Sequence, residues 1–354
     1  MEQKPTVYLV SWNGYDSGGG VERVVGIVKR IIEKKYPVVI VDKKLIMNDP
    51  QYRRRYRSDQ TLFLMVLFSS YVRRTAGKRD IIIGNGFNAP FVRKDLSIAH
   101  GCMYTFKKSI NKFPWSGSTF FEMIAHRNCR QILAVSEEAK HSLMRYYGIR
   151  ERKIDVINNC VDSQIFFPLM EHTEPSKTII AFCGRLEEAK GLDVLLKLAA
   201  AIEKSTEYQL YIATPGKENN EAFYGRKNIK LQVGVSLEEM NRFYNSCDVL
   251  FMPSRFEGFE MVTLEALSAG VPVVGNYVGA IKELSDVGYD GVSVIKSSYV
   301  EQILEQLKGN AYIYKNNKEK QQSLHQQIKA DFGMERYQKR IMEEIEWAFE
   351  SKRC

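Results

Sequence analysis

Short apolar runs alternate with longer amphipathic stretches along the first half of the chain. Consecutive apolar residues predict buried strands, and apolar positions repeated every three to four residues predict helices. The predicted strands are Val7–Ser11, Val38–Val41, Ile81–Ile83, Ile132–Val135 and Ile154–Ile157. The predicted helices are Val21–Lys35, Thr61–Val72 and Glu137–Tyr147, with Ser136 as the N-cap of the last one.

The alternation stops near Pro168 and starts again at Thr178. The polar stretch Met170–Lys177 contains a proline and predicts a linker. The strands predicted after it are Thr178–Phe182, Gln209–Ala213, Ile229–Val233, Asp248–Met252 and Pro272–Val274. The helices predicted after it are Leu192–Lys204, Leu237–Asn245, Thr263–Ala269 and an amphipathic terminal helix over Asp331–Glu350.

Strands that alternate with helices predict an α/β protein with parallel sheets covered by helices on both faces. The chain has 354 residues, a length that suits two domains. We therefore expect two Rossmann-like, doubly wound domains, over residues 1–168 and 169–330. Such sheets bind ligands at the carboxyl ends of their strands, so the expected site is a central cleft that both domains face.

The charge is unevenly distributed between the two halves. Residues 1–168 hold 28 Lys and Arg against 15 Asp and Glu, whereas the remainder holds 23 against 27. This asymmetry suggests that the first half faces an anionic partner, such as a membrane surface, a phospholipid-linked substrate or nucleic acid. The six cysteines show no zinc-like or paired spacing and indicate free thiols in a reducing compartment. We see no signal-peptide profile, and the longest apolar run, Leu62–Phe68, is too short to span a bilayer.

Two carboxylates eight positions apart form the most informative motif. Glu257 begins a Gly-Phe turn after the predicted strand Asp248–Met252, and Glu265 lies in the helix that follows. Both could accept hydrogen bonds from a polyhydroxylated ligand, and the N–H groups at the start of the helix could hold an anion. A nucleotide sugar needs both features, although surface carboxylates at a helix start are also common.

A second loop, Cys183–Gly191, follows the predicted strand Thr178–Phe182. It carries Arg185 and Lys190, and a guanidinium with an ammonium at a sheet edge suits a diphosphate. A solvated charge pair is the alternative. The glycines Gly18 to Gly20, just before the helix at Val21, would let a ligand approach the backbone, although a tight turn without a ligand explains them equally well.

These motifs resemble the family-four retaining glycosyltransferases of GT-B fold, of the nucleotide-sugar-dependent type that builds bacterial surface polysaccharides. The resemblance rests on Gly184-Arg185-Leu186-x-x-x-Lys190-Gly191 and on Glu257-Gly-Phe followed by Glu265-Ala-x-x-x-Gly270-x-Pro-Val. Weaker matches are the Gly19–Arg23 loop, Val135-Ser136-Glu137, the segment Ile157–Asp162 with Phe167-Pro168, and the terminal helix. The resemblance covers nearly the whole chain and is most specific in its second half.

The resemblance implies a role for individual residues. Arg185 and Lys190 would neutralise the donor diphosphate, Glu257 would accept from sugar hydroxyls, and Glu265 would hold the ribose. The amides of Gly258, Phe259, Glu260 and Met261 would face sugar or phosphate, and Gly19 and Gly20 would close on the diphosphate. His100 falls where such enzymes place a histidine near the reaction centre, although a structural role is the alternative. Neither a metal nor a cofactor is implied, and the last helix, about 331–354, would join the first domain.

One position departs from the family pattern. Where this chain has Glu260, the family usually has glycine or proline. A carboxylate there could lie near the sugar and alter the choice of donor, or it could point to solvent. Its backbone N–H could still bind phosphate in either case.

The implied reaction moves a sugar from a nucleoside diphosphate sugar, UDP in preference to GDP, to an acceptor. The acceptor would be a polysaccharide, a polyprenyl-diphosphate-linked sugar or lipopolysaccharide, in O-antigen or capsule synthesis. Another reaction type on a GT-B fold, a sugar-binding lectin, and a basic membrane- or nucleic-acid-binding protein are the alternatives. The second half is acidic and no nucleic-acid-binding module is recognisable, so we expect no nucleic-acid partner.

Basic clusters with neighbouring aromatic residues lie in the first half. They are Arg53–Arg57, Arg73-Arg74, Lys78-Arg79, Arg93-Lys94 and Lys107-Lys108, with Phe106, Phe113, Pro114 and Trp115 beside the last cluster. Such a surface suits an anionic leaflet or a lipid-linked acceptor. We therefore expect a cytoplasmic protein bound peripherally to the inner face of the plasma membrane.

Overall fold

The computed structural model describes residues 4–15, 19–54, 61–169 and 176–352, and the chain divides into two compact units. The first unit extends to Asn158 and includes the chain from Tyr337 onward, and the second comprises Asn159–Arg336. This division lies ten residues before the predicted boundary at 168, because it assigns the segment around Val161 and Phe166 to the second unit. Most of the predicted linker, and Gly18, Arg55 and Arg57, lie outside the described residues.

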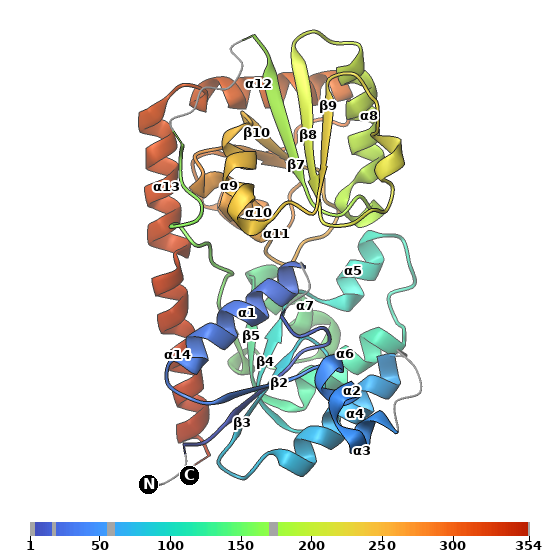
Figure 1. Cartoon of the computed structure of the whole chain (residues 1–354), viewed down its shortest axis with the longest axis vertical. Coiled ribbons are helices and arrows are strands. Elements are labelled where there is room, and N and C mark those ends of the chain that lie inside the picture. Colours follow the sequence, from blue (N-terminus) through green and yellow to red (C-terminus); the bar gives the residue numbers. More distant parts are fainter. Residues whose placement is uncertain (1–3, 16–18, 55–60, 170–175, 353–354) are drawn as a thin grey trace. The chain divides into compact units, whose positions relative to one another are not determined.

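The first unit contains a parallel sheet of six strands in the order β2-β1-β3-β4-β5-β6 (Figure 1). Its strands are β1 (Val7–Val10), β2 (Val38–Val41), β3 (Ile81–Asn85), β4 (Lys94–Ala99), β5 (Cys129–Ala134) and β6 (Ile154–Val156). Its helices are α1 (Gly20–Glu33), α2 (Lys43–Asn48), α3 (Pro50–Arg53), α4 (Thr61–Thr75), α5 (Met103–Ser109), α6 (Gly117–Arg127), α7 (Glu137–Tyr147) and most of α14 (Met334–Glu350).

The second unit repeats this architecture, with strand order β12-β11-β10-β7-β8-β9, again all parallel. Its strands are β7 (Thr178–Cys183), β8 (Tyr208–Thr214), β9 (Ile229–Val233), β10 (Val249–Met252), β11 (Val273–Gly275) and β12 (Val292–Val294). Its helices are α8 (Leu192–Glu203), α9 (Leu237–Asn245), α10 (Met261–Ser268), α11 (Gly279–Asp286), α12 (Val300–Tyr314) and α13 (Lys318–Phe332). The predicted α/β class with two doubly wound parallel sheets is therefore confirmed.

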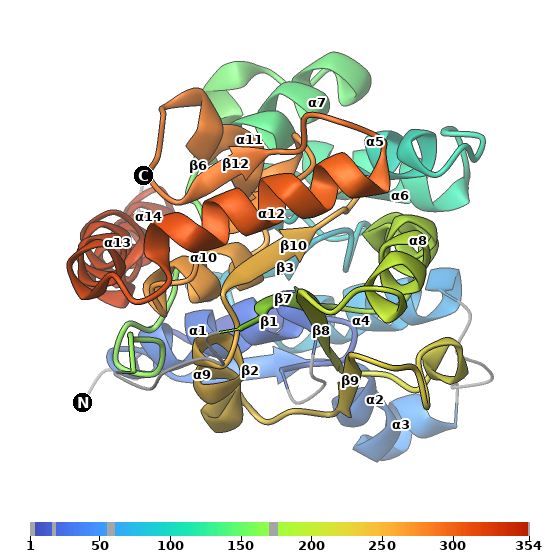
Figure 2. The same ribbon diagram turned by 90° about the horizontal axis from the view of Figure 1, so that it is seen from above.

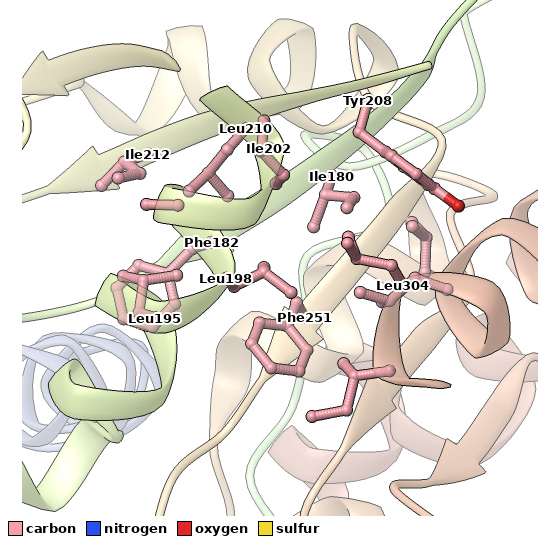
Figure 3. Close-up of a cluster of buried hydrophobic side chains, with 14 of the residues drawn as sticks. Ile180, Phe182, Leu195, Leu198, Ile202, Tyr208, Leu210, Ile212, Phe251 and Leu304 are labelled. Atoms are coloured by element: carbon pink, nitrogen blue, oxygen red, sulfur yellow. The ribbon is translucent and has the colours of Figure 1, made fainter. Parts of the chain in front are cut away.

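The core of the second unit lies between its sheet and the helices α8 and α12. Ile180 and Phe182 of β7 and Phe251 of β10 pack there against Leu195 and Leu198 of α8 (Figure 3). In Figure 2, α12 runs across the strands, and it contacts β7, β10 and β11. This packing holds the carboxyl ends of β7 and β10 at fixed positions, from which the loops of interest start.

The terminal helix is shorter than predicted because Gly333 interrupts it. Helix α13 ends at Phe332, whose carbonyl accepts a hydrogen bond from the Val161 N–H at 2.9 Å, and α14 starts at Met334. From there α14 packs on the first unit: Lys34 donates to Gln338 at 2.7 Å, and the rings of Tyr36 and Phe349 lie 4.5 Å apart.

Strand β4 is the clearest omission from the predicted elements. It begins with Lys94 and Asp95, which are 0% and 3% exposed. Charged residues rarely occupy a buried strand, so the pattern concealed this one. Lys94 was also expected on the basic surface, and that prediction is wrong. Its ammonium lies inside the unit and donates to the Ala89 carbonyl, and burial lowers its pKa to about 8.

Candidate functional site

The strand order of the second sheet identifies one place where a ligand could bind. From β7 the chain proceeds through β8 and β9 on one side, then crosses to β10, β11 and β12 on the other. The loops after β7 and β10 therefore diverge, and doubly wound sheets bind ligands at this switch point, outside the carboxyl ends of the strands. These two loops carry the motifs predicted to bind the donor.

The two loops are locked together at their bases. Gly191 has φ of +77°, and a Cβ on it would lie 2.3 Å from the Pro253 carbonyl oxygen, so only glycine fits. The Arg255 N–H donates to the Ala189 carbonyl at 2.8 Å, and the Arg255 guanidinium donates to the Glu188 carbonyl at 2.6 Å. These contacts hold the side chains of both loops in one place.

Lys190 and Glu257 meet between these loops. The Lys190 ammonium lies 2.6 Å from a carboxylate oxygen of Glu257, and the two side chains are 20% and 8% exposed. Each group has further hydrogen-bonding capacity, because an ammonium has three protons and a carboxylate has two oxygens. The pair could therefore present a cation to a phosphate and an acceptor to a sugar hydroxyl at the same point.

Arg185 is the other predicted diphosphate ligand, and its side chain extends into solvent. It is 65% exposed and pairs with Glu187 at 3.0 Å. An exposed ion pair of this kind contributes little free energy, so Arg185 could leave it for a stronger anion at small cost.

The turn from Glu257 to Met261 leads directly into α10, whose first N–H groups have no acceptor within the helix. Phe259 anchors the turn: its carbonyl accepts from the Asn159 amide at 2.7 Å, and its ring lies 5.7 Å from that of Phe332. Gly258 lies partly exposed before it, so the backbone amides at this helix start could bind a phosphate.

Glu260 does not point to solvent, which corrects one of the two options derived from the sequence. The residue is 8% exposed, and its carboxylate accepts from the Thr263 hydroxyl at 2.7 Å and from the Ala280 N–H at 2.8 Å. Burial, reinforced by the neighbouring Glu257 carboxylate, raises the pKa of Glu260 to about 7.

Glu265 is more buried than expected, at 1% exposure. One of its carboxylate oxygens accepts from the Tyr244 hydroxyl at 2.9 Å. The Tyr244 hydroxyl therefore fixes the orientation of this carboxylate. Its predicted bond to a ribose stays a prediction.

The switch point of the first sheet lies between β1 and β3, and a hydrogen-bonded chain follows the strand ends there. His100 Nε2 lies 2.6 Å from Asn85 Oδ1, Asn85 Nδ2 lies 3.3 Å from Ser11 Oγ, and Ser11 Oγ lies 3.2 Å from the Gly14 carbonyl. His100 is thus linked to the loop that leads from β1 to α1.

This chain determines the tautomer of His100. The Gly14 carbonyl can only accept, so the Ser11 hydroxyl donates to it and accepts from the Asn85 amide nitrogen. The Asn85 oxygen then faces His100, and Nε2 must carry a proton. Burial lowers the pKa of His100 to about 4, so the ring is neutral at pH 7 and keeps Nδ1 as an acceptor.

Gly19 and Gly20 lie at the start of α1, with Gly19 as the N-cap. A Cβ on Gly19 would lie 2.3 Å from the Glu22 carboxylate, whereas one on Gly20 would meet no atom of the described residues within 4 Å. The packing of the described residues therefore does not require glycine at position 20, and a ligand that approaches this backbone would account for it.

Three residues at these two sites were missed by the sequence reasoning, or quoted without a role. Asn85 ends a buried strand at a switch point, and a polar residue in that place is a signal that could have been used. Arg255 and Asn159 were quoted within motifs, but their contacts depend on loops distant in the sequence. In the described ranges, no group of three or more His, Cys, Asp or Glu side chains could hold a metal ion.

Both halves of the chain match glycosyltransferase families. Residues 17–165 match the family described as Glycosyltransferase Family 4, and residues 177–309 match Glycosyl transferases group 1. Among curated relatives, D-inositol 3-phosphate glycosyltransferase of Kribbella flavida is 27% identical over 46% of this chain, but the match covers only 44% of that protein. An uncharacterized glycosyltransferase of Methanocaldococcus jannaschii is 26% identical over 79% of this chain and 81% of its own length.

Solved structures share the fold at low sequence identity. Sucrose-phosphate synthase of Thermosynechococcus elongatus superimposes with a TM-score of 0.78 at 15% identity, over 98% of this chain and all of that one. HepE of Anabaena, in complex with UDP-glucose, gives 0.72 at 15% identity, over 96% and 99%. WaaG, a glycosyltransferase involved in lipopolysaccharide biosynthesis, gives 0.72 at 13%, over 95% and 99%. The chain therefore resembles family 4 glycosyltransferases over residues 17–165 and group 1 glycosyl transferases over residues 177–309, and it has the GT-B fold of the solved glycosyltransferases.

Proposed function

We propose that this protein is a retaining glycosyltransferase that uses a nucleoside diphosphate sugar to extend a lipid-linked or polysaccharide acceptor in the synthesis of a cell-surface glycan. The observation that carries the proposal is the Lys190–Glu257 pair at the switch point, beside the start of α10. It offers a cation, a hydroxyl acceptor and backbone N–H groups, which are the groups that a sugar diphosphate needs.

The chemistry proposed is attack from the face that the leaving group occupies. The bond from the anomeric carbon to the diphosphate breaks, a bond to the acceptor oxygen forms, and the acceptor's proton moves to a diphosphate oxygen. Lys190 and Arg185 lie in the loop after β7, where both cations would stabilise the negative charge that grows on the diphosphate. Interactions that strengthen as this charge develops raise turnover rather than binding alone.

The donor is proposed to carry uridine in preference to guanosine. Support comes from HepE, a structural neighbour solved with UDP-glucose, and the lipopolysaccharide role of WaaG supports a surface-glycan product. A thermal-shift panel with UDP, GDP, ADP, TDP, CMP and NAD tests the donor site. A nucleotide at about 100 times its dissociation constant should add roughly 2.7 kcal/mol of stability. Stabilisation by none of the nucleoside diphosphates would refute the proposal.

Peripheral binding to an anionic membrane is the second part of the proposal. No helix of the described residues is both long and apolar enough to cross a bilayer. The α5–α6 segment instead exposes Phe113 at 77% and Trp115 at 43%, close in sequence to the exposed cations Lys108 and Lys112. Exposed aromatic rings beside cations are typical of surfaces that rest in a lipid interface.

Co-sedimentation with vesicles that contain anionic lipid tests this part. We expect binding that weakens at high salt and is reduced in a Phe113→Ser/Trp115→Ser variant. Tyr312→Ser, which removes an 84% exposed ring from α12, is the matched control and should bind as the wild type does. Salt-independent binding, or equal loss in both variants, would contradict the assignment of this surface.

A further inference from the structure

Glu260 connects two helices that begin at the candidate donor site. It is the N-cap residue of α10, and its carboxylate also accepts the N–H of Ala280, the second residue of α11. The other carboxylate oxygen accepts from Thr263, in the first turn of α10. A single buried side chain therefore ties the turn Glu257–Glu260 to the start of α11.

The backbone of α11 passes close to both carboxylates of this turn. Gly279 has φ of +56°, and a Cβ on it would lie 2.4 Å from the Glu257 Cβ and 2.2 Å from a carboxylate oxygen of Glu260. Glycine is needed at position 279 because the start of α11 packs directly against the Glu257–Glu260 turn. Asn276, three residues earlier, holds the same segment by donating to the Pro253 and Ser254 carbonyls at 3.0 and 3.1 Å.

The charges around Glu260 are unbalanced. On its own turn it faces Glu257, and the cation that the structure pairs with Glu257 is Lys190. From α10 it meets the neutral Thr263, and α11 carries its charged side chains only after its first three residues. With Glu260 ionised, two carboxylates share one ammonium, and with Glu260 protonated the charges cancel.

A sugar diphosphate brings two further negative charges to this turn. It would raise the free energy of an ionised Glu260 and would leave a protonated one almost unaffected. The raised pKa of Glu260 agrees with this geometry, since burial and Glu257 already oppose ionisation in the free protein. Binding of the donor should therefore be coupled to uptake of a proton.

We propose that Glu260 is a positioning residue for the donor: it holds the Glu257–Glu260 turn against α11, and the donor binds best when its carboxyl is protonated, so donor affinity falls as the pH rises through neutrality. The proposal rests on the proposed function, because it requires a nucleoside diphosphate sugar at this turn. It explains a glutamate at a position where a glycine or proline would leave α11 without this connection.

The experiment measures the dissociation constant of UDP-glucose by calorimetry from pH 6 to pH 8 at constant ionic strength, with GDP-mannose as the probe if the nucleotide panel selects guanosine. A sugar diphosphate has no ionisation of its own in this range. We expect the constant for the wild type to rise about fivefold across the range. Glu260→Gln keeps an acceptor for Ala280 and cannot ionise, so it should bind at pH 8 as tightly as the wild type does at pH 6.

Two further variants separate positioning from charge. Glu260→Ala removes the connection to α11 and should weaken binding at every pH, while the Gln variant rescues it. Glu239→Gln, which removes an exposed carboxylate that caps α9, is the matched control and should keep the wild-type pH dependence. A fivefold change that persists in Glu260→Gln, or an equal affinity of the wild type at both ends of the range, would overturn the proposal. If neither probe binds the wild type, the proposed function itself fails, and this inference fails with it.

Discussion

Replacement of Lys190 by alanine would leave Glu257 without its cation. The two groups lie 2.6 Å apart, and the Glu257 side chain is only 8% exposed. Removal of one partner from a buried pair costs about 3–5 kcal/mol, and since Lys190 is 20% exposed we expect a smaller loss of unfolding free energy, about 2–3 kcal/mol. A second change, Glu257→Gln, removes the uncompensated charge and should restore most of that loss.

Turnover should respond differently from stability. If the Lys190 ammonium also stabilises charge on the departing diphosphate, its loss lowers kcat by at least about 100-fold, equivalent to roughly 2.7 kcal/mol in the activation free energy. Glu257→Gln does not replace that cation. The double variant should therefore be nearly as stable as Glu257→Gln alone but at least about 100-fold slower.

Urea unfolding and steady-state kinetics on the wild type, both single variants and the double variant complete the cycle. The informative comparison is between the double variant and Glu257→Gln, because both lack the carboxylate and differ only in the ammonium. Equal turnover of these two proteins would refute the reasoning. Lys190 would then serve only to neutralise Glu257.

Three other predictions concern residues outside this pair. Gly20→Ala should leave the midpoint of thermal unfolding unchanged and weaken donor binding at least tenfold. Gly191→Ala should instead lower the unfolding free energy by about 2 kcal/mol or more. The reverse pattern would mean that the glycine at position 20 is structural. Asn85→Asp places a carboxylate beside His100 and should raise the imidazole pKa from about 4 to above 6. NMR titration measures this pKa, and Asn85→Ser is the uncharged control. An unchanged pKa would contradict the hydrogen-bonded chain. Burial raises the pKa of Glu122 to about 7 from its usual 4.5. Between these two pH values the carboxyl ionises in the unfolded chain but stays protonated in the folded protein. The free energy of unfolding is therefore highest below about pH 4.5 and falls as the pH rises to about 7. Glu122→Gln should therefore gain up to about 3 kcal/mol over the wild type between pH 5 and pH 8 in urea unfolding, and a difference that does not vary with pH would refute the assignment.

The class of the fold could be predicted because many of its strands are continuous apolar runs. Runs such as Val7–Val10 and Ile81–Ile83 are buried on both faces of a sheet, and short continuous apolar runs of this kind are typical of parallel strands. Strand β4 was missed because its first residues, Lys94 and Asp95, have partners that only the folded chain supplies. For Asp95 these are the Ile82 N–H at 2.9 Å and the Lys352 ammonium at 2.9 Å.

The candidate site was predicted as a set of residues but not as a geometry. The loops after β7 and β10 were correctly placed at strand ends, since a strand followed by glycine and charged residues is a local signal. That Lys190 contacts Glu257 depends on the strand order, which places β10 beside β7, and no local pattern shows that order. The direction of the Glu260 side chain depends in the same way on α11, which begins 19 residues later.

The contacts of α14 constrain the order in which the protein can fold during synthesis. The Asp95 residue is 3% exposed, and its carboxylate pairs with Arg130 at 3.7 Å and with Lys352 at 2.9 Å. Lys352 leaves the ribosome only after every residue of the second unit has been made. Until then the nascent first unit lacks Lys352, the closer of the two cations of Asp95, and it also lacks the helix whose Phe349 ring packs on Tyr36. The folding of the first unit can therefore be completed only after every residue of the second unit has been made, although the first unit starts earlier in the chain.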